Sequence, residues 1–142
     1  MENKKIYFAI KLLAVAGIVT AVYLLVEQFM PAEAFRPCTI NSTVNCDAVI
    51  SGPLAKTLGI PTPLYGLAGY VGILLGAIFL KRKLILGLAI FGLLFCLWIG
   101  YREIFQLRVI CPVCILCQLV MLSIFGLAVA LNIKEKTPPA LT

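Results

Sequence analysis

The sequence predicts an all-α membrane protein, a bundle of four transmembrane helices with one large loop between the first two. Hydrophobic residues make up 62% of the chain and charged residues only 13%, whereas a soluble domain is about 45–50% apolar and about a quarter charged. Four apolar runs, at residues 6–28, 63–80, 84–101 and 109–133, are each long enough to cross about 30 Å of hydrocarbon as a helix. They use most of the chain, so we expect one membrane domain over residues 1–142.

The first run precedes Ala32-Glu33-Ala34, a pattern of small residues typical of a signal-peptidase site. The apolar stretch before it is longer than the roughly 7–15 residues of a signal peptide. We therefore predict an uncleaved membrane anchor over residues 6–28, with cleavage after this motif as the alternative.

The loop at residues 29–62 carries apolar residues that predict short amphipathic helices on the membrane surface, namely Val49, Ile50, Leu54 and Leu58. Ser51-Gly52-Pro53 interrupts them. Ser51 could be the N-cap of a helix that begins at Pro53, or it could act at a site below the loop. Pro61 and Pro63 then mark the start of the second run.

Small residues recur along the second run at three- and four-residue spacing, at Gly66, Gly69, Gly72 and Gly76. Such residues let membrane helices approach closely. We expect this face to pack against another helix.

Basic residues indicate the orientation of the bundle. Eight of the twelve Lys and Arg residues lie at the two ends of the chain or between the second and third runs: Lys4, Lys5, Lys11, Lys81, Arg82, Lys83, Lys134 and Lys136. The positive-inside rule then places both termini in the cytoplasm and the 29–62 loop outside it. The net charge of +6 therefore reflects topology, and we expect no nucleic-acid partner.

With this orientation, four of the six cysteines lie on the extracytoplasmic side: Cys38 and Cys46 in the loop, and Cys111 and Cys114 at the start of the fourth run. The chain has no histidine, which excludes Ser-His-Asp hydrolases and His-ligated zinc or haem sites. Thiols are its only obviously reactive side chains.

Cys111-Pro112-Val113-Cys114 has the features of a redox-active pair. Residues three apart on a helix share a face, and a helix N-terminus stabilises the thiolate that performs disulfide exchange. Pro112 suits the first helical turn. The alternatives are a permanent disulfide or inert thiols.

The loop pair, Cys38 and Cys46, could by itself be a static disulfide. Two pairs on one side of the membrane favour a relay instead, in which a thiolate attacks a disulfide through a mixed disulfide. A four-cysteine zinc site is a rival interpretation, but structural zinc sites favour closely spaced ligand pairs, and these two cysteines lie eight positions apart. We therefore expect no metal.

Cys96 and Cys117 are expected to be small buried apolar side chains. Cys117 lies three residues after Cys114 and could pair with it in place of Cys111. Because a thiol in apolar surroundings is a poor source of thiolate, we favour the outer pair, Cys111 and Cys114.

Taken together, these motifs resemble the vitamin K epoxide reductase (VKOR) family. The resemblance rests on Cys38…Cys46-Asp-Ala-Val-Ile-Ser51, on Gly59-Ile60-Pro61 with Gly66, and on Cys111-Pro-Val-Cys114. It covers nearly the whole chain and is closest to stand-alone prokaryotic members without a fused thioredoxin-like domain. The order of the motifs differs from that of the DsbB type, the other four-helix thiol–quinone family, whose second cysteine pair lies between helices 3 and 4.

The resemblance implies a thiol:quinone oxidoreductase that sustains disulfide formation. A reduced thioredoxin-fold (DsbA-like) partner outside the membrane would attack the loop disulfide at Cys38. Cys46 would then attack Cys111, and Cys114 would pass electrons to a membrane quinone of the ubiquinone, menaquinone or vitamin K type. Since the chain has no histidine, we expect the protons to come from water or from the thiols.

The resemblance also implies three quinone contacts. Gln118 occupies the position of a Tyr that hydrogen-bonds a quinone carbonyl in some members, and Thr62 corresponds to an Asn in the animal enzymes. Ser51 lies one position before the place of the family's Ser or Thr after the loop cysteine. The alternatives are a vitamin K epoxide reductase that recycles quinone and, in another class, a structural membrane subunit with static disulfides.

Overall fold

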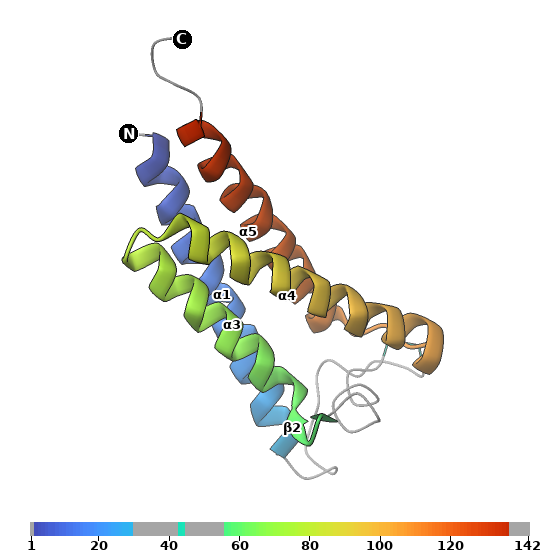
Figure 1. Ribbon diagram of the computed structural model, residues 1–142. Helices are drawn as coiled ribbons and strands as arrows, with labels where there is room; N and C mark the ends of the chain where they lie inside the picture. The colour runs from blue at the N-terminus through green and yellow to red at the C-terminus, as the bar shows by residue number, and fades with distance from the viewer. Residues whose placement is uncertain (1, 30–42, 45–55, 137–142) are drawn as a thin grey trace.

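The computed structural model describes residues 2–29, 43–44 and 56–136 of the protein (Figure 1). Its long elements are the helices α1 (Glu2–Phe29), α3 (Thr62–Ile78), α4 (Arg82–Arg102) and α5 (Pro112–Lys136). A π-helix, η1 (Glu103–Leu107), continues α4. Cys38, Cys46, Ser51 and most of the predicted surface helices lie outside the described residues.

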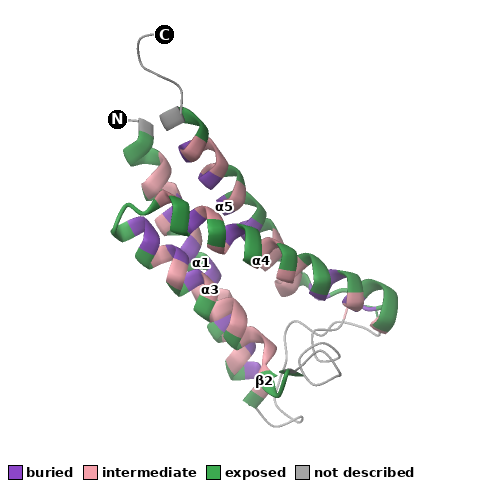
Figure 2. Cartoon of the chain, in the orientation of Figure 1, coloured by how far each residue is buried: buried purple, intermediate pink, exposed green. Residues whose placement is uncertain are grey.

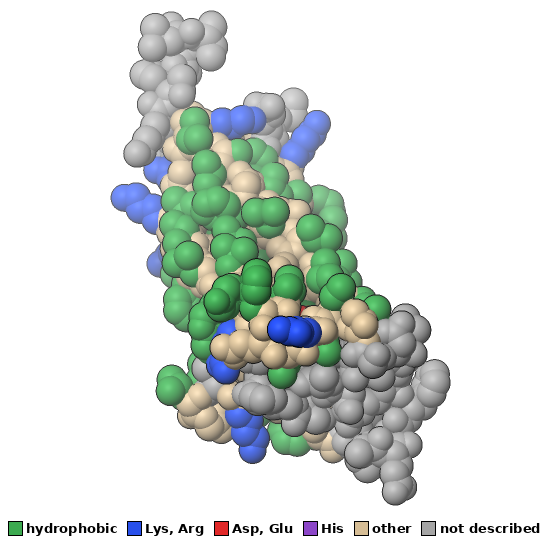
Figure 3. All heavy atoms as spheres, turned by 90° about the vertical axis from the view of Figure 1, so that its right-hand side faces the viewer, with side chains coloured by type: hydrophobic (Ala, Val, Ile, Leu, Met, Phe, Trp, Pro, Cys, Tyr) green, Lys and Arg blue, Asp and Glu red, His purple; other side chains and the backbone are tan. Residues whose placement is uncertain are grey.

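The expected all-α membrane protein is confirmed. Three helical segments, Asn3–Phe29, Arg82–Leu107 and Pro112–Lys134, are long and apolar enough to cross a membrane, and α3 is a shorter apolar helix of 17 residues. Large apolar side chains such as Phe8, Phe91 and Leu119 are exposed. The face drawn in Figure 3 is broadly hydrophobic and has Lys and Arg side chains near the end with the termini and again toward the opposite end. Such a surface suits lipid, because a soluble monomer rarely exposes so large an apolar area.

The four helices pack around one apolar core. α1 lies against α3 and α5, and α4 packs on α3 and α5. Buried positions lie along all four helices (Figure 2). The buried core residues include Ile10, Ala14, Tyr70, Ile73, Ala77, Ile85, Ala89, Ile124 and Ala128. The Tyr70 ring lies against Gly17 of α1, where a Cβ would overlap the ring.

One end of the bundle carries both termini of the described chain (Figure 1). The turn between α3 and α4 is tied to α1 near this end, because the Tyr7 hydroxyl donates a hydrogen bond to the Leu80 carbonyl at 3.2 Å. The basic residues Lys4, Lys5 and Lys81–Lys83 therefore belong to the same region of the molecule.

The connection between α4 and α5 differs most from expectation. The third predicted helix ended near residue 101, but α4 reaches Arg102 and continues as η1 to Leu107. Arg108, with a left-handed φ of 54°, then reverses the chain. The fourth helix begins at Pro112 instead of 109 because Ile110 forms a parallel β-bridge with Val44, and Pro112 provides a favourable first helical residue.

The segment before α3 is a β-hairpin, in which β1 (Lys56–Thr57) pairs antiparallel with β2 (Ile60–Pro61). Leu58 and Gly59 form its turn with φ values of 56° and 81°, as a two-residue hairpin turn requires. The expectation that Leu58 belongs to an amphipathic surface helix is therefore wrong. Its side chain is 93% exposed in the turn.

The glycines of α3 serve two purposes instead of one. A Cβ on Gly72 would lie 2.9 Å from the Leu88 side chain, and a Cβ on Gly76 would lie 3.0 Å from Ile85, so these two positions allow α4 to pack closely. A Cβ on Gly66 or Gly69 would meet no atom within 4 Å. The predicted packing face is thus confirmed at Gly72 and Gly76 and wrong at Gly66 and Gly69, which border a pocket instead.

Candidate redox site

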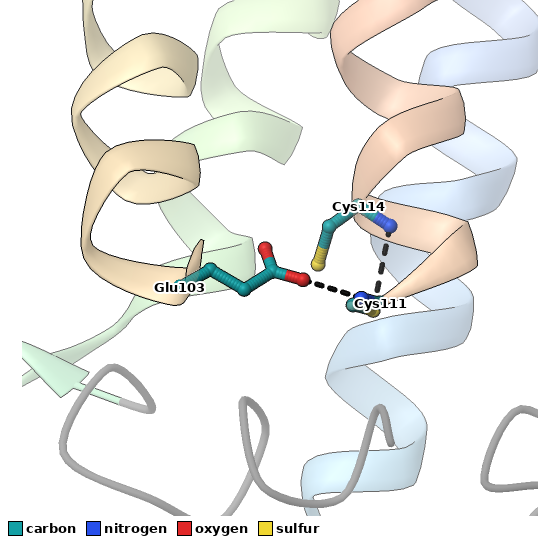
Figure 4. Close-up of side chains that lie close together, drawn as sticks. All are labelled: Glu103, Cys111 and Cys114. Carbon is teal, nitrogen blue, oxygen red and sulfur yellow. Dashed lines mark hydrogen bonds between the residues drawn. The ribbon is translucent and has the colours of Figure 1, made fainter. Parts of the chain in front are cut away.

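Cys111 and Cys114 lie together at the N-terminus of α5. Cys111 directly precedes the helix and is fully buried against Leu24 and Val109, with Tyr23 packed beside them. The backbone N–H of Cys114 donates to the Cys111 sulfur at 3.4 Å (Figure 4). The CxxC motif therefore forms a compact pair at a helix start, as its spacing predicts.

The two sulfurs have different electrostatic surroundings. A hydrogen bond from the Cys114 thiol lowers the pKa of Cys111 below the usual value for a cysteine, with help from the backbone N–H groups of Cys114 and Val113. Burial and the nearby Glu103 charge oppose this lowering. Cys111 is consequently the sulfur of the pair that ionises, and Cys114 is the thiol that donates to it.

Glu103 is a site residue that the sequence analysis missed. It is the first residue of η1 and only 2% exposed, and its carboxylate accepts a hydrogen bond from the backbone N–H of Cys111 (Figure 4). A carboxylate oxygen of Glu103 and the sulfurs of Cys111 and Cys114 all lie within 4.8 Å of one another. The only signal in the sequence was an acidic residue, one of six in the chain, between two long apolar runs.

The local backbone directs Glu103 toward the cysteines. The Val109 N–H bonds back to the Glu103 carbonyl at 3.3 Å across the turn that Arg108 makes. The neighbouring Arg102 is engaged elsewhere, because its Nε donates to Gln106 at 2.8 Å and its guanidinium lies 5.3 Å from the centre of the Trp98 ring. The Arg102 guanidinium is therefore not the partner of the Glu103 carboxylate.

A pocket opens beside Cys114 between all four helices. It has a volume of about 740 Å³ including its open mouth, and it is almost wholly apolar. Its wall includes a group of aromatic residues and glycines: Tyr65, Gly66, Gly69, Tyr70, Phe91, Gly92 and Phe95. Cys114 contributes to this wall, whereas Cys111 does not. Only one sulfur of the pair therefore faces the pocket.

Two of the three predicted quinone contacts also line this pocket. Thr62 lies at the start of α3 and Gln118 one turn beyond Cys114 on α5. The Gln118 amide lies against Gly100, where a Cβ would come within 2.6 Å of its Nε2. Gly100 thus leaves room for the amide. The third predicted contact, Ser51, lies outside the described residues.

A protein-family model of the vitamin K epoxide reductase family matches residues 8–129 of the chain. The match includes all of α3, α4 and the CxxC motif and most of α1 and α5. The chain belongs to the vitamin K epoxide reductase family. A search of curated proteins found no match.

Membership of the VKOR family makes this protein a thiol-dependent oxidoreductase of the class that acts on quinones or vitamin K. The cluster of Cys111, Cys114 and Glu103 is compatible with such a redox centre. Among the described residues, the cluster is a dithiol with a carboxylate beside it.

The other two cysteines of this VKOR-family chain, Cys96 and Cys117, are half-buried and line the pocket. The Cys117 thiol donates to the Thr20 hydroxyl of α1 at 3.2 Å, and the Tyr70 hydroxyl donates to the Cys117 carbonyl at 2.9 Å. Cys117 thus engages α1, whereas the thiol of Cys114 donates to Cys111. The geometry favours the outer pair over a Cys114–Cys117 pair.

The first loop of the VKOR domain touches the chain directly next to the redox pair. Val44 and Ile110 form a parallel β-bridge, and the Ile110 N–H donates to the Thr43 carbonyl at 2.6 Å. Ile110 immediately precedes Cys111. The described part of the loop is therefore anchored one residue away from the buried sulfur.

Proposed function

We propose that the protein is a thiol:quinone oxidoreductase, in which electrons from an extracytoplasmic thioredoxin-fold protein pass through two cysteine pairs to a membrane quinone. The observation that carries this proposal is the position of the Cys111–Cys114 pair. Cys111 adjoins the anchored loop, whereas Cys114 faces the apolar pocket. A pair placed in this way has one sulfur toward a source of electrons and the other toward an acceptor.

The pocket supports a quinone as the acceptor. Ligand sites are typically apolar cavities with a few polar groups that fix orientation, and this pocket has that character. The Thr62 hydroxyl and the Gln118 amide are the polar groups suited to bind the two quinone carbonyls. The open mouth leaves a path for an isoprenoid tail of a ubiquinone, menaquinone or vitamin K type.

The loop contact supports the electron path on the other side. Val44 lies two residues before Cys46, a separation that an extended chain spans in at most about 7 Å, and its bridge partner Ile110 lies one residue before Cys111. Cys38 would receive electrons from the partner protein, and Cys46 would attack the Cys111–Cys114 disulfide. Each exchange proceeds by thiolate attack through a mixed disulfide. Attack of Cys46 on Cys111 releases Cys114, and the favoured ionisation of Cys111 then makes it a good leaving group when Cys38 resolves the Cys46–Cys111 mixed disulfide.

The proposed topology has four membrane spans, both termini in the cytoplasm and the cysteine pairs outside. α3 is the shortest span, and its 17 residues lie at the lower limit for crossing a bilayer. The Tyr7–Leu80 hydrogen bond ties the basic α3–α4 turn to the basic N-terminal segment, which supports a common cytoplasmic side for both.

The test is quinone reduction by the purified full-length protein in detergent, with a reduced thioredoxin-fold protein and a soluble quinone. With the wild type, the quinone absorbance should fall at a rate proportional to the enzyme concentration. Cys114→Ala should reduce the rate at least about 1,000-fold, because the sulfur facing the acceptor is lost. Ser123→Ala, an exposed position on the same helix, is the control and should retain the wild-type rate.

If the rate persists when Cys38, Cys46, Cys111 and Cys114 are all replaced by Ala, the relay is wrong. Vitamin K epoxide offered in place of the quinone separates the two family activities. Reduction of the epoxide but not of the quinone would favour a vitamin K epoxide reductase that serves quinone recycling.

A further inference from the structure

Glu103 contacts the redox pair in a way that packing alone does not require. Its side chain is buried, and the Cys111 N–H is the only group among the described residues that donates to its carboxylate. No Lys or Arg of the described chain forms an ion pair with it. Burying a carboxylate is costly, and no cation of the described residues offsets that cost, so chemistry at the thiols is the most direct explanation for a carboxyl group in this position.

Oxidation of the pair requires a proton acceptor. Starting from the Cys111 thiolate and the Cys114 thiol, formation of the S–S bond releases two electrons and one proton, which comes from Cys114. The chain has no histidine, the usual side chain for this task. The Glu103 carboxylate lies within 4.8 Å of both sulfurs, and the Cys114 sulfur is directed toward it (Figure 4).

We propose that Glu103 is the proton acceptor for Cys114 when the Cys111–Cys114 disulfide forms, an inference that rests on the quinone-reducing function proposed above. The Glu103 carboxylate takes the Cys114 proton as the S–S bond forms, and the quinone takes the two electrons. Quinol formation consumes two protons. One is the proton held by Glu103, and the other comes from water and replaces the proton that Cys111 lost earlier. The carboxylate is thereby regenerated in each cycle.

The neighbouring ionisable groups leave this role to Glu103. At the start of α5, Glu103 faces the thiols of Cys111, which precedes the helix, and of Cys114. On α1, Tyr23 packs beside Cys111, and its hydroxyl donates to the second buried acid, Glu27, at 2.6 Å. On its own segment, Arg102 is held by Gln106 and Trp98. Glu27 is not part of the cluster that joins a carboxylate to the two sulfurs.

The test compares Glu103→Gln and Glu103→Asp with Glu27→Gln, which also removes a buried acid on this side of the bundle. The first measurement is the single-turnover rate of Cys111–Cys114 oxidation by a soluble quinone, followed across pH. We expect Glu103→Gln to be about 100-fold slower near neutral pH, the usual effect of losing a general base. The deficit should shrink as rising pH ionises Cys114 without help, and Glu103→Asp should recover part of the rate.

A second measurement separates proton transfer from structural damage. The ultraviolet absorbance of the thiolate reports ionisation of Cys111 in the reduced protein. The Glu103 charge opposes this ionisation. In Glu103→Gln, Cys111 should therefore ionise at a lower pH than in the wild type, while the Cys111–Cys114 pair is oxidised more slowly. A structural lesion would not produce these two opposite changes together.

The proposal is overturned if Glu103→Gln oxidises at the wild-type rate, or if it is equally slow at every pH and Glu103→Asp does not improve it. A loss of the same size in Glu27→Gln would also overturn it. If the wild type fails to reduce quinone at all, the proposed function is wrong, and a small-molecule disulfide then serves as the oxidant. Cys114 must still lose its proton in that reaction, so the same comparison of variants decides the role of Glu103.

Discussion

At the scale of single residues, the two sulfurs of one CxxC motif differ because one precedes the helix and the other belongs to its first turn. Cys111 receives hydrogen bonds from the Cys114 thiol and from backbone N–H groups that the helix start leaves without internal partners. Cys114 points to the carboxylate and the pocket. In the proposed mechanism, this difference makes Cys111 the attacked, easily ionised sulfur and Cys114 the sulfur that faces the acceptor.

This asymmetry gives a pH prediction for the reduced protein. A lowered pKa means that Cys111 keeps more thiolate at neutral pH than an ordinary cysteine and loses it only as the pH falls through the lowered value. Ultraviolet thiolate absorbance should thus titrate below the usual pKa of about 8.5 for a free cysteine. The Cys111→Ala variant should lose this low-pH transition.

The Cys114→Ala variant tests the cause of the lowered pKa. It removes the hydrogen bond from the Cys114 thiol, which lowers the pKa of Cys111 most, and keeps the backbone donors. The transition should persist in this variant but shift to higher pH. An unchanged transition in Cys111→Ala would mean that another thiol is responsible for it.

At the scale of elements, the four glycines of α3 have two functions: two allow α4 to pack closely, and two leave space for the pocket. Gly72 and Gly76 admit α4, whereas Gly66 and Gly69 leave open space beside Cys114. The pocket therefore exists because two successive glycines withhold side chains from it. Tyr70, next to Gly69, is nevertheless buried against α1 and α5 through Gly17 and the Cys117 carbonyl, so the helix remains firmly packed.

A side chain added at Gly69 should fill the pocket without unfolding the protein. We expect Gly69→Val to raise the KM for quinone about tenfold or more, equivalent to ~1.4 kcal/mol of lost binding, with a melting temperature close to that of the wild type. Gly126→Val is the matched control, since a Cβ there also meets nothing within 4 Å but lies outside the pocket. Gly72→Val should instead lower the melting temperature, because Leu88 occupies its space. An unaltered KM in Gly69→Val would argue against this pocket as the quinone site.

The elements also show what the sequence could predict. Lipid exposure produces long apolar runs, so the helices and the CxxC motif at the start of the last one were recognisable from composition and spacing. The π-helix η1 has no such signature. It depends on the turn at Arg108 and on the Val44–Ile110 bridge, and it is what brings Glu103 to the thiols. Likewise, spacing alone could not separate the packing glycines of α3 from those that open the pocket.

At the scale of the whole molecule, the bundle separates two chemical environments. The α3–α4 turn, with its cluster of three basic residues Lys81–Lys83, is bonded to the N-terminal part of α1. The dithiol and Glu103 occupy the N-terminal end of α5 and the C-terminal end of the α4–η1 segment, away from that turn. The apolar pocket lies between the helices on the side of the dithiol.

This polarity predicts the orientation of the protein in the membrane. Lys and Arg near the ends of spans are retained in the cytoplasm, so the α3–α4 turn should be cytoplasmic and the hairpin before α3 should lie outside.

Two exposed lysines test this orientation in a variant whose six native cysteines are replaced. Lys56→Cys in β1 should react with a membrane-impermeant thiol reagent in intact cells, whereas Lys81→Cys should react only after the membrane is opened. Since both positions are exposed, a difference in labelling reports the side of the membrane and not burial. The reverse pattern would place the dithiol on the cytoplasmic side, where thiols are kept reduced. The proposed oxidation of an extracytoplasmic partner protein would then be wrong.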